Sequence, residues 1–221
     1  MGRSHREEDD EALLQGQHLR LCALCRGEPD RVLEMQMGMY GQIVFETRRK
    51  LVEDFMPIFN SYYQTICGSS EEVGLHYISQ LDGNVDLVEK LANNRERDRI
   101  LGYTSSGVHK DELEMTLGGY LIRRVGSQGQ NKTYLIALKL AQFAFLNKRG
   151  QTTPILLLDD IFDKLDASRV EQIIKLVNQN DFGQIFITDT NRKYLDEIIM
   201  SMNNDYALFH VEKGEVKPME E

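Results

Sequence analysis

The chain has 221 residues, of which 41% are hydrophobic and 28% are charged, and its formal net charge is −9. This composition is ordinary for a globular protein, and the negative charge argues against nucleic-acid binding through the whole surface, although a local basic patch remains compatible with it. No stretch approaches the roughly 18 consecutive apolar residues of a membrane span, and the first ten residues are too polar for a secretion signal. We therefore expect a cytoplasmic protein.

The chain contains three cysteines, Cys22, Cys25 and Cys67. Cys22 and Cys25 have the spacing of a metal-binding pair, but a structural zinc site needs about four ligands, usually supplied by two such pairs. An odd number of cysteines also argues against a disulfide framework. We interpret all three as reduced thiols.

The first 70 residues predict an extension followed by a helical arm. Residues 1–30 show no clean periodicity, and we interpret them as a helix, or as an extension that is disordered or partly foreign to the native protein. Within residues 31–70, apolar side chains recur at helical spacing from Arg31 to about Ile66, which predicts one long helix. Pro57 is expected to kink or restart this helix, and Gly68 is expected to end it.

Residues 71–221 show the pattern of an α/β domain. The first predicted elements are a strand, a turn, a helix and a hairpin, at residues 75–81, 82–84, 85–99 and 112–125. The hairpin is predicted by Gly118 and Gly119, because glycine tolerates the positive φ of a tight two-residue turn. Strands and helices then alternate before a terminal antiparallel strand and turn, at 155–158, 168–178, 184–188, 192–202 and 206–216. We expect a mainly parallel sheet with flanking helices and an antiparallel hairpin.

Four basic residues are candidates for contacts with DNA or phosphate: Arg95, Arg97, Arg99 and Lys132. The three arginines alternate with acidic residues, and we do not expect them to form one helical face. Such a run is usually a solvated surface, and a stripe that contacts phosphate is the sharper alternative.

An apolar strand ends in two carboxylates, Asp159 and Asp160. Four aliphatic residues at 155–158 fit a strand that is buried on both faces, as in the centre of a parallel sheet. Ligands of such sheets bind beyond the carboxyl ends of the strands. There, one carboxylate can hold Mg²⁺ directly or through water, and its neighbour can orient or deprotonate a water. A strand that merely runs into an acidic turn is the competing interpretation.

A second motif begins an amphipathic helix at residues 126–132. Free backbone N–H groups and the positive end of the helix dipole meet there. Ser127 can add a hydrogen bond to a phosphate oxygen, and Gly129 lets the backbone approach a phosphate without a clash from Cβ. Ordinary capping of the helix by Ser127 is the alternative.

Together the two motifs resemble the head of the ABC-type ATPases, in the order signature loop, Walker B strand and D-loop. The matching residues are G-S-Q-G-Q at 126–130, A-L-K-L-A at 137–141 and L-L-L-D-D-I-F-D-K-L-D at 156–166. Within this class the chain is similar to the RecF family over roughly residues 35–212. That similarity is supported by R-E-R-D at 95–98, by G-V-H-K-D-E-L at 107–113, which is similar to the family's Gly-Pro-His-Arg-Asp-Asp-Leu motif, and by Q-I-F-I-T-D-T at 184–190.

The resemblance implies a role for each matching residue. Ser127, Gly129 and Gln130 would contact the γ-phosphate of ATP. This ATP would be bound to the other subunit of a head-to-head dimer. Asp159 would hold Mg²⁺ through water, Asp160 would be the catalytic carboxylate, and Asp166 of the D-loop would lie at the dimer interface. Three departures are Val108, which replaces the family's proline, Asp163-Lys164 before Leu165-Asp166, and the lack of a switch histidine at 188–190.

A Walker A loop is the part that the sequence lacks. Residues 102–107 have the glycine spacing of such a loop, but Val108 and His109 stand where lysine and serine or threonine are required. In the RecF family this loop precedes the arm. We therefore expect the chain to be the C-terminal part of a longer protein, or a truncated product, and we expect it not to hydrolyse ATP alone.

The resemblance implies an ATP-gated dimer that acts in DNA repair, recombination, replication and the SOS response. It would bind DNA at gaps or junctions between single and double strands, and it would promote recombinase loading with the mediators RecR and RecO. Alternatives are the head of another SMC-like or RecN-like repair ATPase, whose very long heptad coils the short arm disfavours, and a non-catalytic scaffold fragment. A transporter nucleotide-binding domain is disfavoured because Leu-Ser-Gly-Gly-Gln and a switch histidine are lacking.

Overall fold

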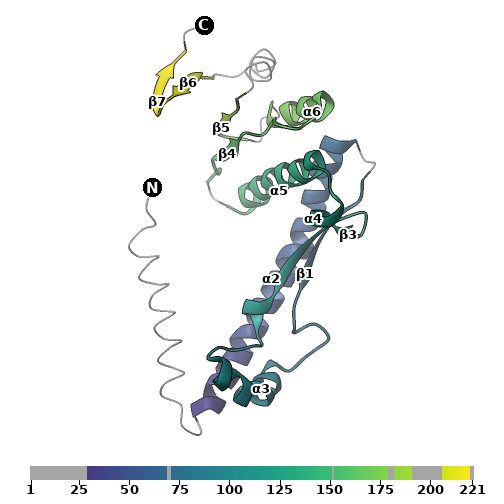
Figure 1. Cartoon of the computed structure of the whole chain (residues 1–221), viewed down its shortest axis with the longest axis vertical. Helices are drawn as coiled ribbons and strands as arrows, with labels where there is room; N and C mark the ends of the chain where they lie inside the picture. The colour runs from purple at the N-terminus through teal and green to yellow at the C-terminus, as the bar shows by residue number, and fades with distance from the viewer. Residues whose placement is uncertain (1–28, 69–70, 151, 179–181, 191–205, 220–221) are drawn as a thin grey trace. The chain divides into compact units, whose positions relative to one another are not determined.

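A computed structural model describes residues 29–68, 71–150, 152–178, 182–190 and 206–219 (Figure 1). Its elements in chain order are α2 (Pro29–Cys67), β1 (Val73–Ile78), α3 (Leu87–Leu101), the 3₁₀ helix η1 (Val108–Lys110), β2 (Glu112–Leu117), β3 (Tyr120–Leu121), α4 (Ile122–Val125), α5 (Gln128–Arg149), β4 (Leu156–Asp159), α6 (Ala167–Asn178), β5 (Ile185–Thr188), β6 (Phe209–Glu212) and β7 (Glu215–Pro218). The chain divides into two compact units. Of the described residues, the first unit takes those at 29–51 and 77–113, and the second takes those from 52 to 76 and from 114 onward.

The long helix predicted for the arm is present as α2; the restart predicted at Pro57 is wrong, and the alternative of a kink there stays a prediction. The helix continues through Pro57. Pro57 is exposed, so water can solvate the carbonyl oxygen that loses its N–H donor four residues earlier. The predicted end is confirmed, because Gly68 has a φ of 71° and its N–H donates to the Gln64 carbonyl at 2.9 Å. The predicted boundary of the arm at residue 70 stays a prediction.

In the first unit, two glycines of α2 let α3 pack closely against it. A Cβ on Gly41 would lie 2.6 Å from Leu87 Cδ2, and a Cβ on Gly38 would clash with Val88. The core of this unit is small and aliphatic-aromatic, and its buried members are Phe45, Leu81, Leu87 and Leu91. The close approach of the two helices therefore depends on the absence of side chains at these two positions.

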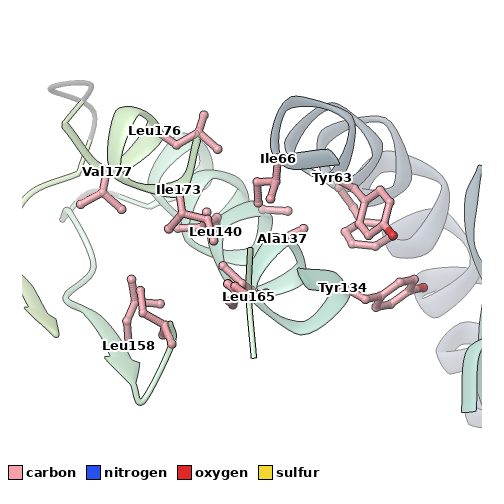
Figure 2. Packing of buried hydrophobic residues seen from close by; sticks show 14 of the residues in the cluster. Tyr63, Ile66, Tyr134, Ala137, Leu140, Leu158, Leu165, Ile173, Leu176 and Val177 are labelled. Carbon is pink, nitrogen blue, oxygen red and sulfur yellow. The ribbon is translucent and has the colours of Figure 1, made fainter. Parts of the chain in front are cut away.

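The second unit holds the main core, to which α2, α5, α6 and the strands β1, β2 and β4 contribute buried side chains; Figure 2 shows its part around α5 and α6. Tyr134 of α5 is 1% exposed, and its hydroxyl donates to the Gly74 carbonyl at 2.7 Å. Its ring lies 4.8 Å from the ring of Phe59, centroid to centroid. Along α5, the buried side chains of Ala137 and Leu140 continue this face. The buried side chains of α5 form one packed stripe along the helix, whereas Leu135 and Leu146, which helical spacing also assigns to the buried face, are exposed.

The predicted glycine hairpin is confirmed, but its second strand is shorter than expected. β2 and β3 pair antiparallel with Leu117 opposite Tyr120, and Gly118 and Gly119 both have positive φ. β3 ends after two residues, and residues 122–125 form α4 instead of a strand. The Gly126 N–H donates to the Ile122 carbonyl at 2.8 Å and closes a helical turn. A local turn bond thus overrides the β preference of these residues.

β4 and β5, which α6 connects along the chain, pair in parallel, with Asp159 opposite Thr188. The prediction that the 155–158 strand is buried on both faces was wrong. Leu156 and Leu158 are buried, whereas Leu157 is 63% exposed and Ile155 is 58% exposed. The helices of the core cover one face, and among the described residues none covers the other. The predicted helix at 192–202 lies outside the described residues.

The last described elements, β6 and β7, pair antiparallel around a turn at Lys213 and Gly214, as predicted. A parallel strand pair with packed helices, antiparallel hairpins and a long leading helix confirm the predicted fold class. Among the helices that the structure describes, none has the length and apolar character needed to cross a membrane.

Candidate nucleotide-contacting site

The loop at residues 126–130, which we call the signature turn, is held by a reciprocal cap at the start of α5. Ser127 Oγ accepts from the Gln130 N–H at 3.2 Å, and Gln130 Oε1 accepts from the Ser127 N–H at 2.8 Å. The pattern Ser-x-x-Gln is the sequence signal of this capping box. Ser127 is exposed and its hydroxyl proton is not used by the cap, so the side chain can still donate to an anion.

Gly129 lies where the signature turn meets the D-loop. A Cβ at this position would lie 3.2 Å from the Lys164 carbonyl oxygen and 3.2 Å from Arg169 Nη1. The absence of a side chain therefore serves the packing of the two loops. The predicted approach of this backbone to a phosphate stays a prediction.

Glu71, which no sequence pattern marks, tethers the signature turn to the core. Its Oε1 accepts from Gln130 Nε2 at 2.7 Å, and its Oε2 accepts from the Tyr63 hydroxyl at 2.5 Å. Burial alone would raise the pKa of Glu71, but the hydrogen bonds from Tyr63 and Gln130 and the charge of Arg169 outweigh it and lower the pKa below its usual value. Burial and the bond to Glu71 raise the pKa of Tyr63. No motif marks Glu71, because it lies in an irregular segment before β1.

Replacing Glu71 with glutamine should lower the free energy of unfolding by about 1–2 kcal/mol at neutral pH, because two charge-assisted hydrogen bonds are weakened. The folded pKa of Glu71 is lowered, so its stabilisation is present above the unfolded pKa and is lost as the pH falls through the folded value. The difference in free energy of unfolding between the wild type and Glu71→Gln should therefore become smaller as the pH falls from 7 to 3. Urea unfolding across this pH range measures it.

The control for this prediction is Glu72→Gln, because Glu72 is the exposed neighbour in the chain. Its stability should follow that of the wild type at every pH. A gap between wild type and Glu71→Gln that stays constant down to pH 3 would contradict the tether.

Asp159 and Asp160 lie together at the carboxyl end of β4, beside the end of β5. The Thr188 hydroxyl donates to Asp159 Oδ1. The Asp160 N–H donates to the Thr188 carbonyl at 2.9 Å and lies 3.1 Å from Thr188 Oγ1. Thr188 was not predicted as a partner of these carboxylates, although it lies in the segment 188–190 where relatives carry a switch histidine.

The two carboxylates fit a Mg²⁺ ion that arrives with a nucleotide better than an isolated metal centre. Within the described ranges, no group of three or more His, Cys, Asp or Glu side chains could hold a metal. Magnesium usually keeps several waters and takes one or two carboxylates together with substrate phosphates. Asp159 and Asp160 match that requirement, and the role of each stays a prediction.

Asp166 of the D-loop caps α6. Its Oδ1 accepts from the Arg169 N–H at 2.9 Å, and its Oδ2 lies 3.5 Å from Arg169 Nε. Arg169 Nη2 also lies 4.0 Å from Glu71 Oε1. Arg169 thus links the D-loop to the tether of the signature turn. Its position three residues after Asp166 was the signal that the sequence offered.

As expected from the sequence, the three arginines of α3 do not form one face, but two of them, Arg95 and Arg99, do share a face. Arg95 donates two hydrogen bonds to Glu34, from Nε to Oε1 at 2.8 Å and from Nη2 to Oε2 at 2.7 Å. Arg99 Nη2 donates to Asp30 Oδ2 at 2.6 Å. Residues four apart are neighbours on a helix, so alternation along the sequence hid the shared face. The exposed Arg97 has no ion pair among the described residues. DNA contacts of these arginines stay predictions.

The glycine-spaced segment at 102–107 is a helix end and not a phosphate loop. Gly102 has a φ of 75° and its N–H donates to the Asp98 carbonyl at 2.8 Å, which ends α3. The Ser105 N–H donates to Asp98 Oδ1 at 3.1 Å. After Gly107 the chain forms only the short η1 helix. A phosphate loop would instead begin a regular helix.

The motif at 107–113 builds a buried carboxylate in the first unit. The side chain of Asp111 is 2% exposed, and it accepts from the Tyr77 hydroxyl and, at 2.7 Å, from Ser79 Oγ. Arg48 Nη1 lies 3.3 Å from Asp111 Oδ2 and donates to the Val108 carbonyl at 2.7 Å. This network fixes the loop between α3 and β2.

Comparison with known proteins gives consistent relatives, although no family model matches the chain. The chain is 86% identical over 190 residues to the DNA replication and repair protein RecF of Parabacteroides distasonis, which covers 86% of the chain and 52% of that protein. It is 59% identical over 185 residues to RecF of Porphyromonas gingivalis, covering 84% of the chain and 51% of that protein. The chain thus spans about half the length of the curated relatives it matches.

Solved structures give the same fold at low sequence identity. The recombination mediator protein RecF with ATP, of the RecFOR pathway, superposes with a TM-score of 0.70 and 19% identity over 93% of this chain and 54% of that one. An SMC head bound to the C-terminal winged-helix domain of ScpA gives a TM-score of 0.50 and 15% identity over 93% of this chain and 53% of that one. These two likenesses speak for the fold alone.

Proposed function

Because this chain is homologous to RecF, a DNA replication and repair protein, over about half of that protein's length, we propose that it supplies the signature turn, the Walker B carboxylates and the D-loop of a RecF-like ATPase head. The observation that carries this proposal is the meeting of Asp159 and Asp160 with the start of α5 in one compact unit. The weaker likeness to an SMC head makes that alternative second.

We propose that the two halves of the site serve two nucleotides. Ser127, Gly129 and Gln130 contact the γ-phosphate of ATP bound to a second copy, where free N–H groups and the helix dipole favour negative charge. Asp159 holds Mg²⁺ through water, and Asp160 orients the attacking water. Asp166 contacts the second copy. When bound, Mg²⁺ with ATP supplies the charge neutralisation that phosphoryl transfer requires.

The proposed cellular role is that of a recombination mediator in the cytoplasm. It binds DNA at gaps or at junctions between single and double strands, and it promotes recombinase loading together with RecR and RecO. The names of the relatives and of the RecFOR structure support this role. The chain's net charge of −9 restricts its DNA contacts to a local patch, for which exposed Arg97 is one candidate.

The purified 221-residue chain should show no ATP turnover above background, with or without DNA. Turnover should arise in the completed protein, which we define as this chain joined to the part of the Parabacteroides distasonis RecF that it does not match. There, Asp160→Asn should lower the rate by about 10²–10⁴-fold, because a general base contributes that much. A phosphate-release assay measures both proteins. Turnover by the chain alone that disappears in Asp160→Asn would refute the half-site proposal.

A further inference from the structure

Lys132, which the sequence suggested as a contact for DNA or phosphate, lies against the turn at Asp160, after the end of β4. Its Nζ donates to the Asp160 carbonyl oxygen and is 3.9 Å from Asp160 Oδ2. The side chain of Lys132 is 24% exposed, whereas that of Asp160 is 52% exposed. The lysine is thus turned toward the backbone of the turn, and the carboxylate is left open to solvent.

Asp160 has a backbone conformation that depends on its neighbours. Its φ is 46°, in the left-handed region that a residue with a Cβ rarely adopts. Its N–H is bound to Thr188 of β5, and its carbonyl is bound to Lys132 of α5. Both backbone groups of Asp160 are therefore fixed, each by a different element, and together they set the direction of its side chain.

Lys132 is also fixed relative to the signature turn. It follows Ser127 by five residues, in the first turns of α5. The neighbouring side chains hold this helix start: Asn131 Nδ2 donates to the Gly126 carbonyl at 2.9 Å, and the Thr133 hydroxyl donates to the Gly129 carbonyl at 2.8 Å. A shift of the turn that carries Ser127 therefore moves the base of the Lys132 side chain with it.

We propose that Lys132 is a positioning residue that couples the signature turn to Asp160. It keeps the Asp160 backbone in its left-handed conformation, and it transmits occupancy of the signature turn by a second copy's nucleotide to the carboxylate that serves this chain's own nucleotide. The coupling rests on the proposed function. The local clamp does not, because it is a property of the chain alone.

The clamp is tested on the 221-residue chain by amide hydrogen exchange at Asp160, followed by NMR. Lys132→Met removes the donor but keeps the aliphatic stem, and it should speed exchange at Asp160 about tenfold by loosening the turn. Lys132→Arg should restore slow exchange, since it keeps a donor at this position. Lys139→Met is the matched control, because Lys139 is exposed on the same helix. In this variant the Asp160 amide should exchange at the wild-type rate. Unchanged exchange in Lys132→Met would overturn the clamp.

DNA binding by the same variants decides the alternative role of Lys132. If Lys132 positions Asp160, Lys132→Met should leave the chain's affinity for a gapped duplex, and its dependence on salt, the same as in Lys139→Met. A DNA contact would instead reduce the affinity and lower the salt slope by about one for each lost phosphate contact. That result, with unchanged exchange at Asp160, would replace our proposal by a DNA contact.

The coupling is tested in the completed protein. Lys132→Met should lower kcat about tenfold or more with little change in KM, and Lys132→Arg should recover most of it, because the effect is on the orientation of Asp160 and not on nucleotide binding. A normal kcat in Lys132→Met would overturn the coupling. Absence of turnover with the native Lys132 would overturn the proposed function, while the exchange result on the chain alone would still decide the clamp.

Discussion

Replacing Phe59 with alanine should lower the free energy of unfolding of the second unit by about 3–5 kcal/mol, which is the usual effect of removing a buried aromatic ring. Phe59 is fully buried on α2, and its ring lies 4.8 Å from that of Tyr134 and 6.3 Å from that of Tyr63. The cavity would open beside Tyr63, whose hydroxyl reaches Glu71. Chemical denaturation followed by circular dichroism measures the change.

A matched control for Phe59→Ala is Leu135→Ala, because Leu135 lies on α5 beside Tyr134 but is 52% exposed. Its effect should stay within about 0.5 kcal/mol. Equal effects of the two substitutions would mean that the aromatic cluster does not hold the second unit together.

Two inactive variants of the completed protein should restore activity to one another when mixed. Ser127→Asp keeps a residue that caps helices well, but its negative charge would repel a γ-phosphate. Asp160→Asn keeps the shape of the turn and removes the carboxylate. Each variant alone should lose turnover, because each damages both sites of a symmetric dimer. In an equal mixture, half of the dimers are mixed and each has one intact site, so about one quarter of the wild-type rate should return.

Ser127→Asn is the control for this experiment, because it keeps the helix cap without the charge, and it should retain more activity than Ser127→Asp. A mixture no more active than its components would mean that the signature turn and the carboxylates do not serve different nucleotides. The titration of one variant against the other gives the measurement, through ATP turnover at constant total protein.

The sequence predicted those parts of the fold that short-range patterns control. Helical spacing predicted α2 and α5, and two glycines predicted the turn between β2 and β3. Burial is a property of what covers a strand, so four aliphatic residues at 155–158 could not reveal that only Leu156 and Leu158 are buried. The strand predicted at 122–125 failed because one backbone bond from Gly126 closes a helical turn.

The motifs of the candidate site could be predicted from the sequence, but the side chains that hold these motifs in place could not. Ser127, Asp159 and Asp160 stand in recognisable spacings, and the structure brings the two carboxylates to the same sheet edge as Thr188. Glu71 lies 59 positions before Gln130 in the chain, and its role depends on folding that no local pattern encodes. Lys132 illustrates the same limit, because a cation in a sequence does not reveal whether its partner is a phosphate or the protein itself.

The face of the β4–β5 pair that no described residue covers affects the physical behaviour of the chain in solution. Ile155, Leu157 and Phe186 form a row of aliphatic and aromatic side chains that are each at least half exposed, with Leu157 and Phe186 directly opposite one another. Each 100 Å² of such surface that is removed from water contributes about 2.5 kcal/mol. Sulfate and other salts that are excluded from protein surfaces strengthen the burial of such apolar surface. The same three side chains therefore limit the solubility of the chain and favour any surface that fits over them.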